Sequence, residues 1–552
     1  MKLKNILYSM MMGTAVLTGT TSCVSDLDQY PHTETTSKDV YTSLANYEAV
    51  MGKIYAAMVT SGQGKGGDNK DMESVLNNGS GFDYMRMFIN MQECGTDEFA
   101  STWLTGEQTT GLTYLSWDAN DAWVSDMYYR IYYNIALCNE FLRNANSASF
   151  SGADAEKMKE YKAEVRFMRA LFYYHALDFY RNIPMVTEND PVGSYIPPRY
   201  TPQQTFDYIE SELKDCVGDM LPASTCPYGQ ASQGAAYTLL AKLYLNSEVY
   251  TGVAKYAECK EACEKVMDMG YSLESDYSKL FNADNNKRTN EIIFALPVSA
   301  EHTVSWGSST YLVCGQVSMS NANQNVADYG VTAGWSEFRL RPEFVDKFTQ
   351  TDIDGNGDKR CKFFTNGQNK DVTSMTDEAT GYLSEKWSNL KDDGTTASNT
   401  ADAGVETDFP LFRLADVYLM YAECVARLGE DWDNWNGGSD AEAATRKEGA
   451  IYYINKVRER AYGDAEHNVW KDNFASDADF LQFILDERAR ELYHEGYRRT
   501  DLIRFGQFTT NKYIWQWKGG THDGQAVDSK YNIYPIPNTE LTANPNLHND
   551  NY

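Results

Sequence analysis

Apolar residues recur at helical spacing along most of this chain. They return every three or four positions in the segments 119–145, 153–180, 203–220, 234–250, 254–269, 412–428, 444–461 and 478–493. A run from Ser37 to Met58 has the same period, and Ser37 suits an N-cap position. This spacing collects the apolar side chains on one face of a helix. The chain is therefore predicted to be mostly α-helical.

Two neighbouring segments, 234–250 and 254–269, carry small residues where their helices would cross. Ala235 and Ala241 in the first and Ala262 in the second stand among larger apolar residues. Alanines let two helices approach closely, and stacking against further pairs then buries the outer faces. We therefore expect a scaffold of tetratricopeptide-like helical hairpins.

The helical period is lost in two long stretches. Residues 59–118 are irregular, and residues 285–405 are rich in Gly, Ser, Asn and Thr. The helical scaffold is thus expected over about 37–280 and 409–510, interrupted by a large, mostly irregular insertion at about 285–405. Loops held on a rigid scaffold often carry a ligand site.

The insertion contains two tryptophans whose neighbours are small and polar. Trp306 lies in Ser305-Trp306-Gly307, and Trp335 follows Gly334. Turn-forming neighbours leave an indole face uncovered. Each tryptophan could anchor its loop in the core, or the two could form a contact surface for a ligand.

The N-terminus has the features of an export signal. A positively charged head, a short apolar run and small residues precede Cys23. This order resembles the lipobox of bacterial lipoproteins, although Thr20 replaces the usual leucine; it implies a signal peptide over 1–22 and lipidation of Cys23. Asp26 and Asp28 resemble the acidic patch that directs such lipoproteins to the cell surface. The alternative is an ordinary secretory peptide with an incidental cysteine. We expect a lipid-anchored, surface-exposed protein of the outer membrane.

Charge and composition limit the classes of molecule that could bind this chain. Lysine and arginine number 49 against 78 acidic residues, and the net charge of −29 argues against a nucleic acid as partner. The 39 tyrosines and 11 tryptophans suit a protein that binds by stacking. Of the ten cysteines, nine remain besides Cys23; they form no C-x-x-C pair and are interpreted mostly as small buried residues.

One segment resembles the start of a calcium loop. Asp352, Asp354, Asn356 and Asp358 place oxygen ligands at alternate positions, but the twelfth position is Phe363 instead of a glutamate. An Asn/Asp/Gly turn explains the same residues. Calcium is kept as an alternative here, and no other metal or cofactor is expected.

Several segments are similar to the SusD/RagB family of outer-membrane nutrient-binding lipoproteins. They are residues 164–174 with the following segment to Pro184, 412–423, 487–506, 534–537 and 544–547. The resemblance spans nearly all of the mature chain and implies a single SusD-like domain over 23–552. The charged residues of 487–506 are interpreted as a lattice of ion pairs three and four positions apart on a helix, with a scaffold role.

Other segments resemble the starch-binding member of this family. They are residues 96–98, 309–315, 334–336 and 506–520. The resemblance implies a cell-surface receptor that cradles a helical α-glucan on an arc of aromatic side chains. Its starch or maltooligosaccharide ligand would then pass to a SusC-like, TonB-dependent transporter of the outer membrane.

The resemblance also implies ligand-binding residues. Two members of the aromatic arc correspond to Trp103 and Trp335. The third corresponds to Tyr311 if no gap precedes Trp335, or to Trp306 if one does. An arginine of the site corresponds to Arg86. Aromatic faces would stack on the C–H face of a pyranose, and polar groups would bind its hydroxyls.

Two alternatives to starch binding stay open. Gly106 stands where the starch-binding member has a hydrogen-bonding asparagine, so the same fold could bind a different glycan, or a peptide. A surface glycoside hydrolase would need two carboxylates that meet in space. The chain has no H-E-x-x-H, G-x-S-x-G or P-loop motif, so we do not expect an enzyme.

Overall fold

The computed structural model describes residues 37–64, 71–72, 75–76, 82–399, 404–432 and 449–552. The signal peptide expected over 1–22 and the acylated Cys23 lie outside these residues. The chain divides into two compact units, Met1–Ala49 and Val50–Tyr552. In the first unit, α2 (Ser37–Val40) and the start of α3 (Leu44–Val59) form the predicted N-terminal helix, which is broken in two.

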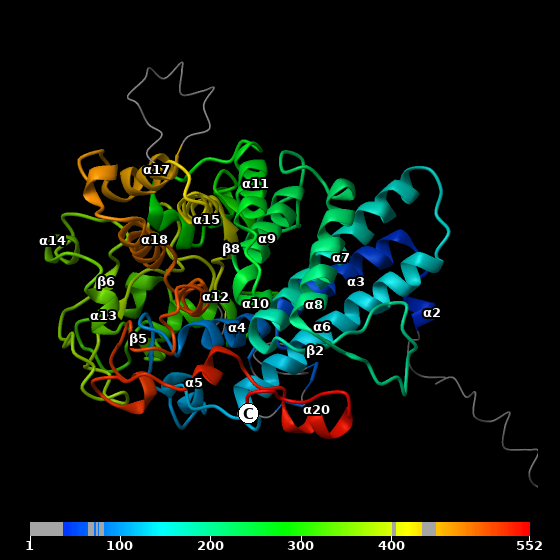
Figure 1. Ribbon diagram of the computed structural model, residues 1–552, viewed down its shortest axis with the longest axis horizontal. Helices are drawn as coiled ribbons and strands as arrows, with labels where there is room; N and C mark the ends of the chain where they lie inside the picture. The colour runs from blue at the N-terminus through cyan, green and yellow to red at the C-terminus, as the bar shows by residue number, and fades with distance from the viewer. Residues whose placement is uncertain (1–36, 65–70, 73–74, 77–81, 400–403, 433–448) are drawn as a thin grey trace, which may run out of the picture. The chain divides into compact units, whose positions relative to one another are not determined.

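The larger unit is mostly helical, as predicted (Figure 1). Its long helices are α6 (Ala122–Ser147), α7 (Ala153–Tyr180), α8 (Pro202–Cys216), α9 (Gln233–Leu245), α11 (Tyr256–Met267), α15 (Leu414–Arg427), α17 (Ala450–Tyr462) and α18 (Asp477–Leu492). Its shorter helices are α4 (Tyr84–Glu93), α5 (Thr110–Tyr114), α10 (Ser247–Thr251), α12 (Ser308–Gly315), α13 (Pro342–Val345), α14 (Gln350–Ile353), α19 (Arg498–Arg504) and α20 (Asn538–Ala543).

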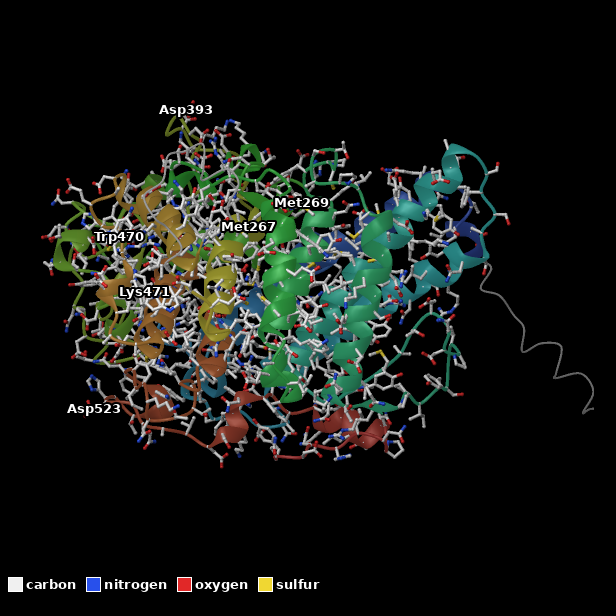
Figure 2. The ribbon with its side chains drawn as sticks, turned by 45° about the horizontal axis from the view of Figure 1, so that its top comes forward. Met267, Met269, Asp393, Trp470, Lys471 and Asp523 are labelled. Carbon is white, nitrogen blue, oxygen red and sulfur yellow. The ribbon has the colours of Figure 1, made fainter. Side chains whose placement is uncertain are left out.

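The scaffold is built from helices packed in successive pairs. Helix α6 packs on α7, α9 on α11, and α11 in turn on α15. Ala235, Ala241 and Ala262 are buried, as expected for small residues at the point where two helices cross. Helix α11, which ends at Met267 (labelled in Figure 2), therefore lies against one helix from each half of the scaffold.

The described strands form four two-stranded antiparallel sheets. The pairs are β1 (Ala100–Ser101) with β5 (Phe338–Arg339), β2 (Ile183–Pro184) with β3 (Arg199–Tyr200), β4 (Ile292–Leu296) with β8 (Phe409–Arg413), and β6 (Phe363–Phe364) with β7 (Leu383–Ser384). In the longest pair, Ile292 lies opposite Arg413 and Leu296 opposite Phe409. The insertion thus leaves the scaffold along β4 and returns along the adjacent β8.

Five of the described helices, α4, α5, α12, α13 and α14, occur where irregular structure was predicted, and α4 and α12 are the longest of them. Helix α4 begins after Asp83, whose carboxylate accepts the backbone N–H of Arg86 at 2.8 Å, and all ten of its residues are buried. Helix α12 lies in the insertion and is also buried throughout. The residues of α12 show no amphipathic period. In α4, Arg86, Asn90 and Glu93 recur four and three positions apart, but this polar face is buried within the protein as well. At β8 the structure has a strand where a helix was predicted: the first two residues of the predicted helix 412–428 belong to β8, and α15 begins after them.

The charged residues of 487–506 join distant elements. Arg488 binds Asp416 at 2.8 Å and Asp501 at 2.7 Å, and Arg504 binds Glu423 at 2.7 Å. These groups are buried, so the interpretation as a lattice along one helix was wrong for most of them. Only the pairs Arg490–Glu487 and Arg504–Asp501 have that spacing among the described pairs within the segment. The scaffold role itself fits their burial between helices.

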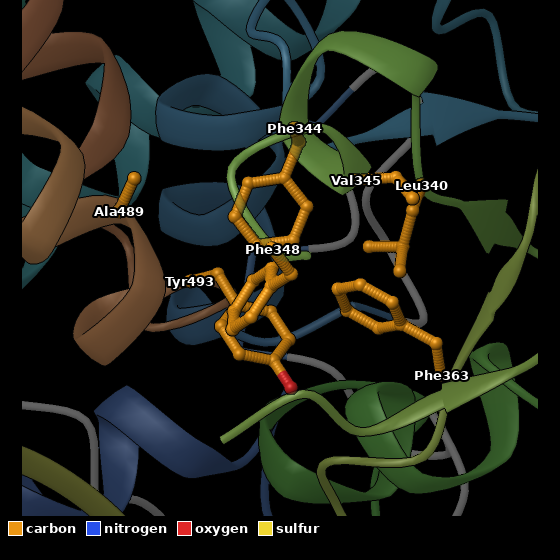
Figure 3. Close-up of a cluster of buried hydrophobic side chains, with 7 residues drawn as sticks. All are labelled: Leu340, Phe344, Val345, Phe348, Phe363, Ala489 and Tyr493. Atoms are coloured by element: carbon orange, nitrogen blue, oxygen red, sulfur yellow. The ribbon is translucent and has the colours of Figure 1, made fainter. Parts of the chain in front are cut away.

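The insertion is fixed to α18 by a cluster of apolar side chains (Figure 3). Its members are Leu340, Phe344, Val345, Phe348, Phe363, Ala489 and Tyr493. The first five come from the insertion and the last two from the C-terminal part of the scaffold. Tyr493 also donates its hydroxyl to the carbonyl of Arg360 at 2.9 Å. The irregular segment is therefore packed onto the helices through its own core.

The described cysteines behave largely as predicted. All nine are free thiols; seven are buried, and Cys226 and Cys361 are partly buried. The thiol of Cys259 donates to the carbonyl of Ala241 at 3.2 Å, across the pair α9 and α11. They serve as small packing residues.

The side chains of the calcium-like segment are bound within the protein. The Asp352 carboxylate accepts the backbone N–H groups of Thr349 and Asp358 at 2.8 and 2.7 Å, and the Asp358 carboxylate pairs with Arg360. Among the described residues, no three Asp, Glu, His or Cys side chains meet in a group able to hold a metal ion. The capped turn is the interpretation that these contacts favour. Within the same residues, no helix combines the length and apolarity that crossing a membrane requires.

Acid should destabilise the fold below about pH 4. Burial alone would raise the pKa of Asp416, Glu423 and Glu491, but buried Lys and Arg partners lower each to about 2. A carboxyl whose pKa is lower in the folded chain than in the unfolded chain stabilises the fold above its unfolded pKa, here 3.8 or 4.5. That contribution is lost as the pH falls towards 2. Melting temperatures recorded between pH 5 and 2 should fall steeply, and a flat profile would contradict the assignment.

Candidate functional site

Three tryptophans from separate segments meet in one open pocket. Trp103, Trp306 and Trp335 line a space of about 400 Å³, together with Phe82, Arg86, Glu107, Met319, Ala333, Gly334 and Glu337. Trp103 is 39% exposed and Trp306 45% exposed, and Trp335 is half-buried. Exposed indole faces of this size, gathered in one concave surface, mark a binding site.

Asp83 positions the loop that carries Trp306. Besides capping α4, its carboxylate accepts the hydroxyl of Ser305 at 2.7 Å and the backbone N–H of Ser308 at 3.1 Å. A Cβ at Gly307 would lie 2.2 Å from one of the Asp83 oxygens, so only glycine fits there. The buried carboxylate thus holds both sides of Trp306 while the indole stays exposed.

Backbone contacts position Trp335. Its N–H donates to the carbonyl of Cys314 at 2.8 Å, at the end of α12. A Cβ at Gly334 would lie 2.6 Å from the carbonyl oxygen of Val317, so the chain can pass at this point only because residue 334 is glycine. The indole N–H of Trp103 donates to the Trp335 carbonyl at 3.1 Å. The two tryptophans are therefore linked directly.

The sheet of β1 and β5 brings Trp103 and Trp335 together. Ser101 is paired with Phe338, so Trp103 follows one strand where Trp335 precedes the other. Gly106 lies beneath the Trp103 ring: a Cβ at this position would be 3.2 Å from the ring atom Cε3. The glycine that departs from the starch-binding pattern thus allows Trp103 to lie close to its own loop.

Arg86 lies below the aromatic residues and is only 2% exposed. It donates to the carbonyl of Trp306 at 2.7 Å, pairs with Glu107, and lies 3.4 Å from Glu337. Its guanidinium carbon is 4.0 Å from the ring centroid of Phe82. Each terminal nitrogen makes one of these hydrogen bonds, so Arg86 holds the Trp306 backbone in place and also lines the pocket. Its expected role in ligand binding stays a prediction.

Tyr311 lies outside the pocket lining. It is fully buried in α12, and its hydroxyl donates to the side-chain oxygen of Asn90 at 2.7 Å. The Arg86 guanidinium lies over its ring, 4.2 Å from the centroid. Of the two residues that the sequence offered for the middle of the arc, only Trp306 presents a ring face to the pocket.

The base of the pocket is acidic without carrying a free cation among its described residues. Burial raises the pKa of Glu337 well above its ordinary value; Arg86 opposes this shift, and Glu107 adds to it. One Glu337 oxygen, Oε1, has no hydrogen-bond partner. Because Arg86 is paired with Glu107, the pocket has no positive charge to offer an anion. Its chemistry suits a neutral ligand with hydroxyl groups.

Six lining residues were not among the predicted site residues: Phe82, Glu107, Met319, Ala333, Gly334 and Glu337. Met319 is 60% exposed and hydrogen-bonds through its backbone N–H to Ser336 at 2.6 Å. Nothing in its sequence neighbourhood indicates a pocket residue. Glu337 could have been found, because it follows Trp335 by two positions and alternation in an extended segment places both on the same side.

Comparison with known proteins places this architecture in a family. A family model described as "SusD family" matches residues 355–552, and one described as "Starch-binding associating with outer membrane" matches residues 27–245. The chain is 32% identical to the Starch-binding protein SusD of Bacteroides thetaiotaomicron, over 99% of both chains. The chain belongs to the SusD family. A more distant relative, SusD-like protein P25 of Formosa agariphila, is 27% identical over 78% of each chain.

Solved structures share this SusD-family fold. A SusD-like carbohydrate-binding protein from Bacteroides fragilis superposes with a TM-score of 0.70 at 19% identity, covering 92% of this chain and 100% of that one. Surface glycan-binding protein A from Bacteroides thetaiotaomicron, solved in complex with laminarihexaose, gives a TM-score of 0.66 at 17% identity over 92% and 99% of the two chains. At these identities the likeness concerns the fold alone.

Proposed function

We propose that this SusD-family protein captures starch or maltooligosaccharides by stacking glucose units on Trp103, Trp306 and Trp335. The observation that carries the proposal is the pocket itself: three partly exposed indoles over a base in which the only cation among the described residues, Arg86, is paired with Glu107. A curved α-1,4-glucan offers successive C–H faces to such an arc, and its hydroxyls would reach Glu107 and Glu337. The 32% identity to a protein named for starch binding supports the choice of ligand.

The proposed role ends in delivery of the glucan to a partner. The lipobox-like Cys23 would anchor the chain in the outer membrane at the cell surface, where a SusC-like TonB-dependent transporter would receive the ligand. Three stacking contacts of about 1–1.5 kcal/mol each, reduced by ordering costs, imply micromolar to millimolar binding. Weak binding suits a receptor that must release its ligand. Hydrolysis is not part of the proposal, and reducing ends released from starch by purified protein would contradict that view.

Removal of Trp335 tests the proposed ligand. We expect Trp335→Ala to weaken binding of a cyclic maltooligosaccharide at least tenfold in isothermal titration, because one stacking contact of about 1.5 kcal/mol is lost. Trp470, labelled in Figure 2, is a matched control: it is 41% exposed and is not among the residues that line the pocket. Trp470→Ala should leave the affinity unchanged. Equal affinity of the wild type and the Trp335→Ala variant would contradict the proposal.

A different neutral glucan is the second candidate. Gly106 removes the side chain that the starch-binding pattern places beside Trp103, and a structure with the same fold is a complex with laminarihexaose. A pull-down on insoluble starch and on insoluble β-1,3-glucan, with protein lacking residues 1–23, separates the two. If the protein is retained on the β-1,3-glucan alone, that glucan and not starch is the ligand. The proposed role of the three tryptophans in stacking would still hold.

A further inference from the structure

A second open pocket has a lining different from that of the tryptophan pocket. Helix α6 contributes Tyr128, Tyr129, Tyr132 and Tyr133; the loop 191–197 contributes Tyr195 and Ile196; and α20 contributes Glu540 and Ala543. The pocket measures about 520 Å³, more than the tryptophan pocket. Figure 1 locates α6, β2 and α20, the elements around it.

The spacing of the tyrosines explains the aromatic wall. Positions 128, 129, 132 and 133 are one and four apart, so α6 presents all four rings on adjoining stripes. The rings of Tyr128 and Tyr132 lie 4.6 Å apart between centroids. Tyr128 is buried and supports the others, whereas Tyr129, Tyr132 and Tyr133 are half-buried and present their surfaces to the pocket.

Hydrogen bonds within the protein already occupy two of the donors around this pocket. The Tyr132 hydroxyl donates to the Pro184 carbonyl at 2.8 Å, and the Asn544 amide donates to the Pro197 carbonyl at 3.0 Å. Burial and the nearby Asp71 carboxylate together raise the pKa of Tyr133 to about 12, so its hydroxyl stays neutral. The phenolic oxygens keep lone pairs, and Glu540 adds a carboxyl group. What the pocket offers is therefore mainly acceptors beside flat aromatic faces.

These properties select the chemistry of a ligand. No lysine, arginine or histidine is among the described residues that line the pocket, which disfavours anions. A proline-rich peptide also favours aromatic grooves, but its prolines lack the N–H donors that the acceptors require. A small quaternary cation would suit aromatic rings, yet a single such group fills only a fraction of about 520 Å³. A neutral oligosaccharide has C–H faces, many hydroxyl donors and sufficient size.

We propose that the tyrosine pocket between α6, the loop 191–197 and α20 is a second binding site for neutral oligosaccharides. It shares no lining residue with the tryptophan pocket, so it does not rest on the function proposed for that pocket. Two sites on one chain would let a polysaccharide be held at two points, which raises the apparent affinity without any new contact.

The test uses a chain in which the tryptophan pocket has been disabled. In a Trp306→Ala, Trp335→Ala background, we expect residual binding of at least one of maltoheptaose, laminarihexaose and cellohexaose in isothermal titration. Adding Tyr129→Ala and Tyr133→Ala should lower that affinity at least tenfold. The matched Tyr129→Phe, Tyr133→Phe variant keeps the ring faces and should lose less than threefold.

A second variant guards against a folding defect. Ala543 is exposed and lines the pocket, so Ala543→Arg leaves the core intact and places a long side chain next to Glu540. It should also lower the affinity at least tenfold, with an unchanged melting temperature. The proposal is overturned if none of the three sugars binds the background chain, or if binding survives both the alanine and the Ala543→Arg changes. It is also overturned if choline chloride or a polyproline peptide binds there and the sugars do not.

Discussion

Trp306→Ala should weaken glucan binding by at least tenfold, whereas Tyr311→Phe should change it less than twofold. The two residues competed for the middle place of the aromatic arc, and only Trp306 faces the pocket, at 45% exposure. Loss of its ring removes a stacking contact of about 1.5 kcal/mol, equivalent to roughly a tenfold change in Kd. Isothermal titration with maltoheptaose measures both variants.

The tyrosine variant has its own expected readout. Tyr311→Phe deletes the hydroxyl that donates to Asn90 and leaves the amide oxygen buried without that donor. We expect a loss of about 1–2 kcal/mol in the free energy of unfolding, seen as a lower melting temperature. A large loss of affinity in Tyr311→Phe with an unchanged Trp306→Ala would reverse the assignment of the middle position.

The largest loss of stability is expected from Arg413→Met. Arg413 is fully buried and binds Glu495 at 2.7 Å, Glu491 at 2.5 Å and Glu291 at 3.1 Å. Removal of the cation leaves three carboxylates without one of their partners in a buried site. Breaking a buried ion pair in this way costs about 3–5 kcal/mol. Chemical denaturation followed by tryptophan fluorescence measures the change.

Two further variants serve as controls for Arg413→Met. Arg413→Lys keeps the charge but loses the fork that reaches several carboxylates, so its loss should be intermediate. Lys159→Ala breaks a solvent-exposed pair with Asp219 and should leave the denaturation midpoint unchanged. If Arg413→Met were as stable as the wild type, the buried network would not be the element that fixes the scaffold strand β8 against α18.

Long amphipathic helices were the part of the fold that the sequence predicts best. The segment 153–180 coincides with α7, and 478–493 differs from α18 by one residue at each end. Helix α4 was missed although Arg86, Asn90 and Glu93 recur four and three positions apart, because it is only ten residues long and lies in a stretch that is otherwise irregular. Only the Asp83 cap would have indicated its start.

Part of the pocket could also be predicted from the sequence. Small neighbours at Trp306 and Trp335 indicate uncovered indoles, and the resemblance to known family members added Trp103. The direction of a side chain is not encoded by such patterns. Arg86 and Tyr311 therefore could be named from the sequence, but their burial depends on α4 and α12, two helices that were not predicted.

The pairing of β4 with β8 has an evolutionary consequence. Because the segment between them leaves and re-enters the scaffold on neighbouring strands, its two ends are held together whatever lies between. Doubling the length of a flexible loop costs only about 0.6 kcal/mol in closure entropy. Segments of different length and composition can therefore be exchanged at this point while the helices stay unchanged. Exchange of the segment between β4 and β8 would in this way give the same helical scaffold a new ligand specificity.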